Sequence, residues 1–327
     1  MKVKKLFFHI GHGKTGSSAI QAMLAQNHEV LKQNGYLYPF HDNFKNALRG
    51  FISSGNINAG KDKSWLENQV IARIDSNPEF HTYIFSSESL FRNLSPLLDS
   101  DYMHNNHWRI HILLAVRNPI DMISSHHQQA VKRGGYKDNL KTFIRENKHA
   151  ASALQYSARL IKNLDKYGAT YSIVNYSVEK LEIASRFAEI MGISQILEDS
   201  PLGANRIVNR SLTAQELSFV ASINAIYGNK KGARLSDKLV NELPELKADR
   251  LFISQEDMDL IIKNNHEALS EINQKLGKKS KLTFEYHPTV SHDLPTSLDP
   301  RQAALIRSML ERPKRKRRNY PEESPQK

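Results

Sequence analysis

The sequence predicts an α/β fold, a three-layer sandwich in which helices cover both faces of a central parallel sheet. Strand-like runs alternate with helical patterns through about residues 1–195, and strands interleaved with helices imply a parallel sheet covered on both faces. A glycine-rich turn joins the first run to the first helical pattern. Beyond about residue 205 only helical patterns recur. We therefore expect a single domain over 1–311, with an α/β core (1–195), a helical portion (205–311) and a basic disordered tail (312–327).

The first expected strand, residues 3–10, leads into the glycine-rich turn at 11–16. Further strands are expected at 82–87, 110–116 and 169–176, where short apolar runs recur. After the turn, apolar residues follow the period of one continuous helix: Ile20, Met23, Leu24, Val30 and Leu31.

Helix boundaries are marked by residues suited to caps. Asn118 is expected to cap a helix after the third strand, with Pro119 at its first position. A helix over 178–191 should end at Gly192, because glycine readily takes the left-handed conformation of a C-cap. In the second half, Thr213–Glu216 is a capping-box pattern, and a further helix should begin after Ser254.

The composition is that of a globular protein, with 39% hydrophobic and 24% charged residues among 327. There is no cysteine, which excludes a disulfide framework and thiolate metal sites. The start of the sequence lacks the features of a signal peptide, and no run is long enough to span a membrane, so we expect a cytoplasmic protein. Seven Lys or Arg against two Glu give residues 312–327 a charge of +5, leaving +7 of the total +12 on the body. That excess indicates an anionic ligand.

The turn after the first strand has the properties of a phosphate-binding loop. Gly11, Gly13 and Gly16 allow the backbone to approach a ligand closely, and backbone N–H groups converge where a helix begins. Lys14 adds a full positive charge. In a nucleotide-hydrolase P-loop the lysine would stand where Ser17 is found, so the loop is P-loop-like without matching that motif.

Two motifs together resemble the PAPS-dependent sulfotransferases, where PAPS is 3′-phosphoadenosine 5′-phosphosulfate. Lys14–Ser18 (KTGSS), following a strand, resembles the 5′-phosphosulfate loop of this family, most closely its bacterial and carbohydrate-acting branches. Arg117 at a strand end, with Ser125 eight residues on, resembles the family's pair that holds the donor's 3′-phosphate. Ser124 points about 100° away around the helix and ranks second. The resemblance covers residues 3–192, ending in a weaker likeness over 171–192.

The resemblance implies the donor, its binding residues and the reaction. PAPS would transfer its sulfuryl group to a hydroxyl or amine and leave as PAP, with no metal, and the branch resemblance favours a carbohydrate or glycolipid acceptor. Arg206 and Arg210, which precede the capping box, could close over the adenine nucleotide. The residues expected to bind the donor are Gly13, Lys14, Thr15, Gly16, Ser17, Ser18, Arg117, Ser125 and Arg206.

Sulfuryl transfer to a hydroxyl also needs a general base, with Lys14 stabilising the leaving phosphate. Glu88 is the first candidate, because it follows the strand at 82–87 and sites in parallel sheets collect at such ends. The alternative is that Glu88 only caps a helix and has no catalytic role. His41 is the second candidate, with a plain loop residue as its alternative. Lys132 and Arg133 could meet an anionic acceptor or form an ordinary solvated helix end.

Two other functions stay open at this stage. A nucleotide-dependent kinase would use the same loop, although no aspartate suited to Mg²⁺ follows a hydrophobic strand. A nucleic-acid-binding protein would use the basic tail, but the tail lacks the interleaved aromatic residues that stack on bases, so no specific nucleic acid is expected. The tail could instead contact an anionic membrane surface from the inner side, or serve only as a solubilising end.

Overall fold

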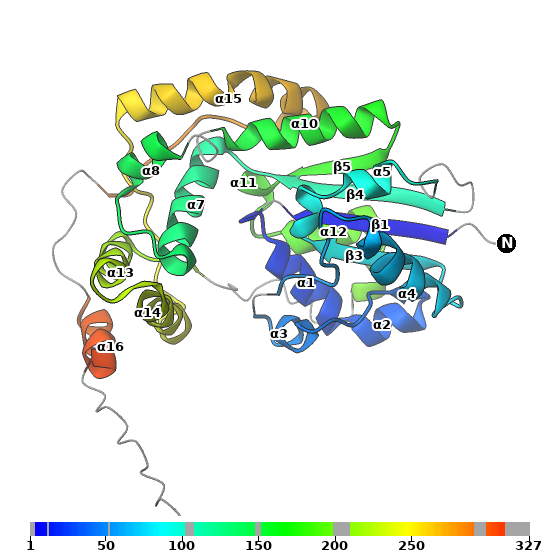
Figure 1. Ribbon diagram of the computed structural model, residues 1–327, viewed down its shortest axis with the longest axis horizontal. Coiled ribbons are helices and arrows are strands. Elements are labelled where there is room, and N and C mark those ends of the chain that lie inside the picture. Colours follow the sequence, from blue (N-terminus) through cyan, green and yellow to red (C-terminus); the bar gives the residue numbers. More distant parts are fainter. Residues whose placement is uncertain are drawn as a thin grey trace, which may run out of the picture.

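The computed structural model describes residues 4–11, 13–51, 53–101, 108–147, 152–198, 210–290 and 299–310. A five-stranded sheet in the order β2-β3-β1-β4-β5 forms its centre, and every neighbouring pair is parallel. Helices cover both faces, so the predicted α/β class is confirmed (Figure 1). The strands are β1 (Lys4–Gly11), β2 (Tyr36–Leu37), β3 (Thr82–Ser87), β4 (Trp108–Val116) and β5 (Thr170–Asn175).

The middle strands are rich in apolar residues because both of their faces are largely buried. Along β1, Leu6, Phe8 and Ile10 enter the core on one face, whereas Phe7 enters the core on the other. This alternation follows the two-residue period of a strand. β4 repeats it with Leu114 on the first face and Leu113 on the second.

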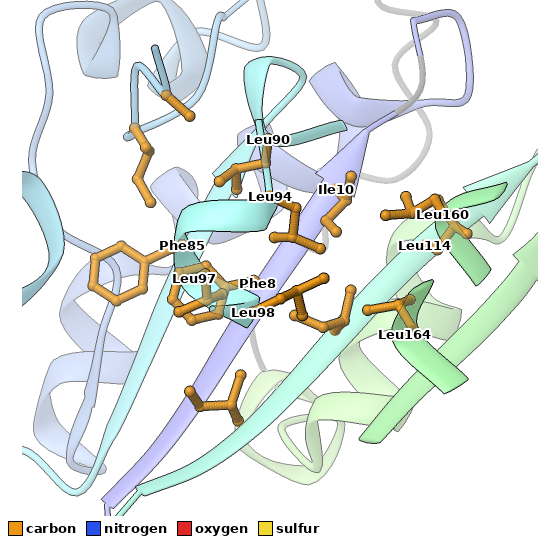
Figure 2. Close-up of a cluster of buried hydrophobic side chains, with 14 of the residues drawn as sticks. Phe8, Ile10, Phe85, Leu90, Leu94, Leu97, Leu98, Leu114, Leu160 and Leu164 are labelled. Atoms are coloured by element: carbon orange, nitrogen blue, oxygen red, sulfur yellow. The ribbon is translucent and has the colours of Figure 1, made fainter. Parts of the chain in front are cut away.

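The first face carries the larger core. Figure 2 shows Phe8 and Ile10 of β1 lying with Phe85 of β3 and Leu114 of β4 under leucines from the helices above them. Residues of α15, far along the chain, join this core through Ile272. The elements on this face are η1 (a π-helix, Leu66–Ile71), α4 (Ala72–Asp75), η2 (Ser89–Phe91), α5 (Ser95–Leu98), α10 (Ala153–Lys166) and α15 (Gln255–Lys275).

The second face is covered by elements from the first two hundred residues. Ile20 and Met23 of α1 pack there with Phe187 of α12. The elements are α1 (Ser17–Gln26), α2 (His28–Gln33), α3 (Phe44–Leu48), α12 (Ile183–Met191) and η3 (Gln195–Leu197).

The helices after residue 205, apart from α15, lie near α7 (Pro119–Gly134), beyond the carboxyl ends of the strands (Figure 1). The predicted capping box is confirmed, with Thr213 and Glu216 bonding reciprocally at the start of α13. Ser254 likewise caps α15 by accepting from Asp257 N. The other helices here are α8 (Leu140–Glu146), α13 (Ala214–Tyr227), α14 (Asn229–Glu242) and α16 (Pro300–Leu310), with α11 (Tyr176–Glu179) and η5 (Lys278–Ser280) as short connections.

Three local predictions differ from the structure. The continuous helix through Leu31 is interrupted at Asn27, whose amide donates to Met23 O at 2.8 Å and so competes with the helical bonding. The helix expected over 178–191 is two helices, α11 and α12, although Gly192 ends the second in the left-handed conformation as predicted. Asn118 stands at the N-cap of α7, but its side chain bonds Thr283 instead of the helix.

The basic tail and Arg206 lie outside the described residues. Across the described ranges, no helix combines the length and the apolar character needed to cross a bilayer.

Phe8→Ala should lower the free energy of unfolding by about 3–5 kcal/mol, because Phe8 is 0% exposed and its removal leaves a cavity between sheet and helices. Urea denaturation followed by circular dichroism measures this change. Ile226→Ala, at a side chain 70% exposed, is the control and should stay within about 0.5 kcal/mol of wild type. Equal losses from both changes would contradict the burial described for Phe8.

Candidate active site

Three neighbouring strands end together and bring the predicted site residues to one edge of the sheet. In the sheet register, Ile10 pairs with Ser87 and Gly11 pairs with Ala115. The residues that follow β3 and β4, Glu88 and Arg117, therefore flank the loop that follows β1. The chain runs from β1 to the β3 side and later returns to the β4 side, so this edge is a topological switch point, where α/β proteins bind ligands.

The loop between β1 and α1 turns sharply through two left-handed residues. Gly16 has φ 85° and forms the N-cap of α1, and a side chain at this position would overlap the ring of Tyr176. Lys14 has φ 73°, and it is the only non-glycine with positive φ in the described chain. Such a conformation costs an L-residue about 1–2 kcal/mol, so surrounding contacts must hold it. Thr15 is fully buried in this turn.

Arg117 supplies one of those contacts and links the two predicted anion-binding motifs directly. Its Nη1 donates to the main-chain carbonyl of Lys14 at 2.9 Å, across 103 residues of sequence. The guanidinium also lies over the Tyr176 ring, 5.3 Å from its centroid, as in a cation–π contact. Lys14 and Arg117 thus belong to a single site.

A pocket of about 160 Å³ opens beside Arg117 at the start of α7. Arg117 Nε is buried and has no hydrogen-bond partner among the described residues, and the Ser124 hydroxyl lies beside that of Tyr286. An anion with several oxygen acceptors, such as a phosphate monoester, fits these donors and the positive side chains of the lining. The lining is formed by Arg117, Asp121, Ser124, Ser125, Gln128, Tyr176, Ser177, Lys180, Ser211, Ala248, Asp249, Arg250 and Tyr286.

The ammonium of Lys14 extends toward α7, where Nζ donates to Gln129 Oε1 at 3.3 Å. Burial lowers the pKa of Lys14 from its ordinary value, and the nearby Arg117 and Arg133 charges lower it further. The Glu88 carboxylate opposes these effects. Lys14 is consequently a half-buried cation whose charge a bound anion would stabilise.

Glu88 lies across the loop from the pocket. Its Oε2 is 3.9 Å from the point where a Cβ would stand on Gly13. Part of its side chain is open to solvent, yet loss of hydration at this edge raises the pKa of the carboxyl. The Lys14 ammonium and the Ser17 hydroxyl act in the opposite direction. A raised pKa makes the Glu88 carboxylate a stronger proton acceptor.

Ser17, Ser18 and His41 were also predicted to belong to the site. Ser17 and Ser18 begin α1, and Ser17 is buried with its hydroxyl beside the Glu88 carboxylate. His41 packs its ring against Tyr38 and Phe44, on the loop that leads into α3. Within the described ranges, no three His, Asp or Glu side chains come together as a metal site requires.

Arg210, which was expected to close over a nucleotide, does not line the pocket beside Arg117. It is 5% exposed, and its guanidinium bonds both carboxylate oxygens of Glu216, at 2.7 and 2.8 Å, and the carbonyls of Leu239 and Leu243. These bonds join the start of α13 to the end of α14, so Arg210 stabilises the helical part.

Two pocket residues, Arg250 and Tyr286, were not predicted from the sequence. They come from the segments that precede and follow α15. Arg250 Nη2 lies 3.5 Å from Asp121, and its guanidinium lies over the ring of Tyr286. Neither residue belongs to a local motif, so no sequence signal pointed to them. A larger cavity of about 730 Å³, lined by residues including Leu66 and Asp99, contains none of the predicted site residues.

No family model and no curated protein matches this sequence. Among solved structures, the chain is similar to the sulfotransferase domain of the olefin synthase from Synechococcus PCC 7002. The two are 13% identical, and the match covers 80% of this chain and 94% of that domain with a TM-score of 0.33. A likeness this distant carries no weight for the activity of this chain.

Gly16→Ala should lower the free energy of unfolding by at least about 1–2 kcal/mol, because φ 85° is strained for alanine and the new Cβ meets Tyr176. The loss should appear as a lower melting temperature in thermal denaturation. Gly134→Ala is the matched control, because a Cβ there meets nothing within 4 Å and the residue lies in helix α7. That control should be neutral or slightly stabilising. A melting temperature unchanged by Gly16→Ala would contradict the described loop.

Proposed function

We propose that this protein is a sulfotransferase, which moves a sulfuryl group from PAPS to a hydroxyl or amine of an acceptor and releases PAP. The proposal rests on the chain's own residues: a phosphate-binding loop at the end of β1, an arginine–serine pair at the end of β4, and a carboxylate at the end of β3.

The observation that carries the proposal is the hydrogen bond from Arg117 to the carbonyl of Lys14. It joins the KTGSS loop to a pocket lined by Arg117 and Ser125, which supports the proposal. A ligand with phosphate groups at both ends could therefore contact both motifs at once. PAPS is such a ligand, and the KTGSS loop and the Arg117–Ser125 spacing both resemble the motifs that bind it.

In this function Lys14 acts at the transferring end of the donor. The bond between sulfur and the bridging oxygen breaks as a new bond forms to the acceptor, and the leaving phosphate gains negative charge. The Lys14 ammonium and the N–H groups at the start of α1 would stabilise that charge. The backbone angle of Lys14, held by Arg117, fixes where the lysine side chain departs from the loop.

Glu88 is our candidate for the general base that takes the acceptor's proton. It stands on the other side of the loop from the nucleotide pocket, which is the side from which an in-line acceptor would approach. Its raised pKa increases its basicity while leaving it ionised above that pKa. A carbohydrate or glycolipid is the proposed acceptor, from the branch that the loop resembles.

Binding of PAP tests the donor assignment. PAP should raise the melting temperature of the wild-type protein, whereas ATP and GTP should not, because only PAP carries the 3′-phosphate that Arg117 and Ser125 would hold. In Arg117→Ala, calorimetry should show PAP affinity lower by about 1.5–3 kcal/mol, the contribution of a charged hydrogen bond.

Arg145→Ala is the control for that experiment, since Arg145 pairs with Glu256 and Asp257 away from the pocket. Its PAP affinity should match the wild type. Stabilisation by ATP but not PAP would overturn the proposal in favour of a nucleotide-dependent kinase.

Glu88→Gln should reduce turnover by about 10²–10⁴, the usual contribution of a general base, without changing PAP affinity. The wild-type rate should rise as pH passes the Glu88 pKa, which lies above the ordinary 4.5, because only the carboxylate accepts a proton. It should fall again as Lys14 loses its proton, at a pKa below the ordinary 10.5. The pH profile of kcat measures both limbs.

In Glu88→Gln, kcat should no longer rise across the pKa of Glu88, and it should still fall as Lys14 loses its proton. Glu79→Gln removes an exposed carboxylate just before β3 and should leave the profile intact. If Glu88→Gln turns over at the wild-type rate, Glu88 is not the base.

A further inference from the structure

The outer edge of β3 is covered by a strand over part of its length only. β2 pairs with just the first two residues of β3. The rest of that edge, Ile84–Ser87, extends past the end of β2 as far as the residue before Glu88. A strand edge without a partner presents unpaired N–H and C=O groups. The end of β3 therefore needs another segment to bond and hold it.

Asn56 bonds this edge as a neighbouring strand would. Its main-chain N–H donates to Ser86 O at 2.9 Å. Its side-chain amide acts like a further peptide group, because Oδ1 accepts from Ser86 N at 2.8 Å and Nδ2 donates to Ile84 O at 3.0 Å. Asn56 is 2% exposed, so loss of these bonds would leave buried polar groups of β3 without partners. One residue thus satisfies three main-chain groups of this strand.

The residues around Asn56 keep it against β3. Gly55 forms an antiparallel bridge with Ser87. It has φ 88°, and a Cβ on it would stand 1.9 Å from Ser86 O, so only glycine allows the chain to come this close. On the other side, the Arg73 guanidinium of α4 donates to the carbonyl of Asn56. The segment is therefore fixed both to the strand and to a helix that covers the sheet.

Ser86 is also held from the side of the phosphate-binding loop. Its Oγ accepts from Gln21 Nε2 of α1 at 3.1 Å and lies 2.8 Å from His9 Nδ1 of β1. All three side chains are buried. Because α1 begins at the loop and Glu88 follows Ser86 by two residues, these bonds set Glu88 relative to the loop. Asn56 completes the same network from the outer edge of the sheet.

We propose that Asn56 is a positioning residue for sulfuryl transfer, whose amide takes the place of the missing length of β2 and holds the end of β3 so that Glu88 faces the loop. This rests on the proposed sulfotransferase function and deepens it, because Asn56 acts through Glu88. A base contributes to the rate only from the correct place, and a misplacement of about 1 Å can lower a rate about a hundredfold.

Asn56→Ala tests this role, because it deletes both side-chain bonds and keeps the main-chain bond to Ser86. The probe is transfer of ³⁵S from saturating labelled PAPS to a fixed amount of an extract of cells that naturally contain the protein. The rate should fall at least about tenfold. KM for PAPS and the affinity for PAP should stay within twofold of wild type, because the pocket beside Arg117 lies across the loop.

The pH profile separates positioning from a general loss of stability. In Asn56→Ala the rising limb of the rate should move to lower pH, because a Glu88 held less firmly gains water and its pKa falls toward the ordinary 4.5. A smaller folded fraction alone would lower the rate without moving this limb. Asn58→Ala removes an exposed amide two residues further along the same segment, and it should keep the wild-type rate and profile.

Asn56→Asp is the second variant, for use if Asn56→Ala does not fold. It keeps the size of the side chain and an acceptor for Ser86 N but loses the donor to Ile84 O, so its rate should fall less than that of Asn56→Ala. Circular dichroism shows whether each variant is folded. If neither folds, Asn56 serves the fold alone and the inference is overturned.

The remaining outcomes distinguish this inference from the proposed function. A folded Asn56 variant with the wild-type rate, or with a reduced rate and an unmoved rising limb, would overturn the inference and leave sulfuryl transfer standing. A loss of PAP affinity as large as the loss of rate would also overturn it. A wild-type protein that binds PAP but transfers no label would remove the transfer step and the inference together, whereas failure to bind PAP would show that the donor assignment is wrong.

Discussion

The candidate site depends on the hydrogen bond from the Arg117 guanidinium to the main-chain carbonyl of Lys14. Lys14 sits in a left-handed conformation that is unfavourable for a residue with a side chain, so the loop needs an external contact to hold its shape. Arg117 provides it from the end of the adjacent strand. The same residue lines the pocket beside α7, and its Nε has no hydrogen-bond partner among the described residues. One guanidinium therefore stabilises the loop and leaves a donor for a ligand.

The charged groups of the site lie close together and are partly removed from water, and their pKa values are shifted as a result. Burial and neighbouring cations lower the pKa of Lys14 and of Lys132, while burial raises that of Glu88. Each of these pKa shifts indicates that the protein by itself stabilises the charged form of the group poorly. Groups with shifted pKa values that lie together at one edge of a sheet are typical of functional sites. A ligand or a reacting group can stabilise the charges that the folded protein by itself stabilises poorly. A polyanionic donor would compensate most of these charges.

Much of the fold could be predicted because its signals are local. Short runs rich in apolar residues marked four of the five strands, and the capping box at Thr213 marked α13. The two-residue strand β2 carried no such run and was not predicted. The errors also have physical causes. Asn27 interrupts a periodic apolar stretch by bonding back to the preceding turn, and Asn118 gives its side chain to Thr283, which is distant in sequence. Periodicity does not record such competing bonds. The periodicity of apolar residues likewise gave no indication that His41 packs against Tyr38 and Phe44.

By itself the sequence determined the order of strands and helices, the glycine-rich loop with Lys14, and the arginine at the end of β4, because each depends on residues close together in the chain. Only the tertiary structure decided that Lys14 and Arg117 touch, that Arg250 completes the pocket, and that Lys132 is buried beside the loop. These facts depend on which strands are neighbours and on how the helices of the second half fold back over the sheet. Contacts between segments a hundred residues apart are set by the packing of whole elements, which no local pattern encodes.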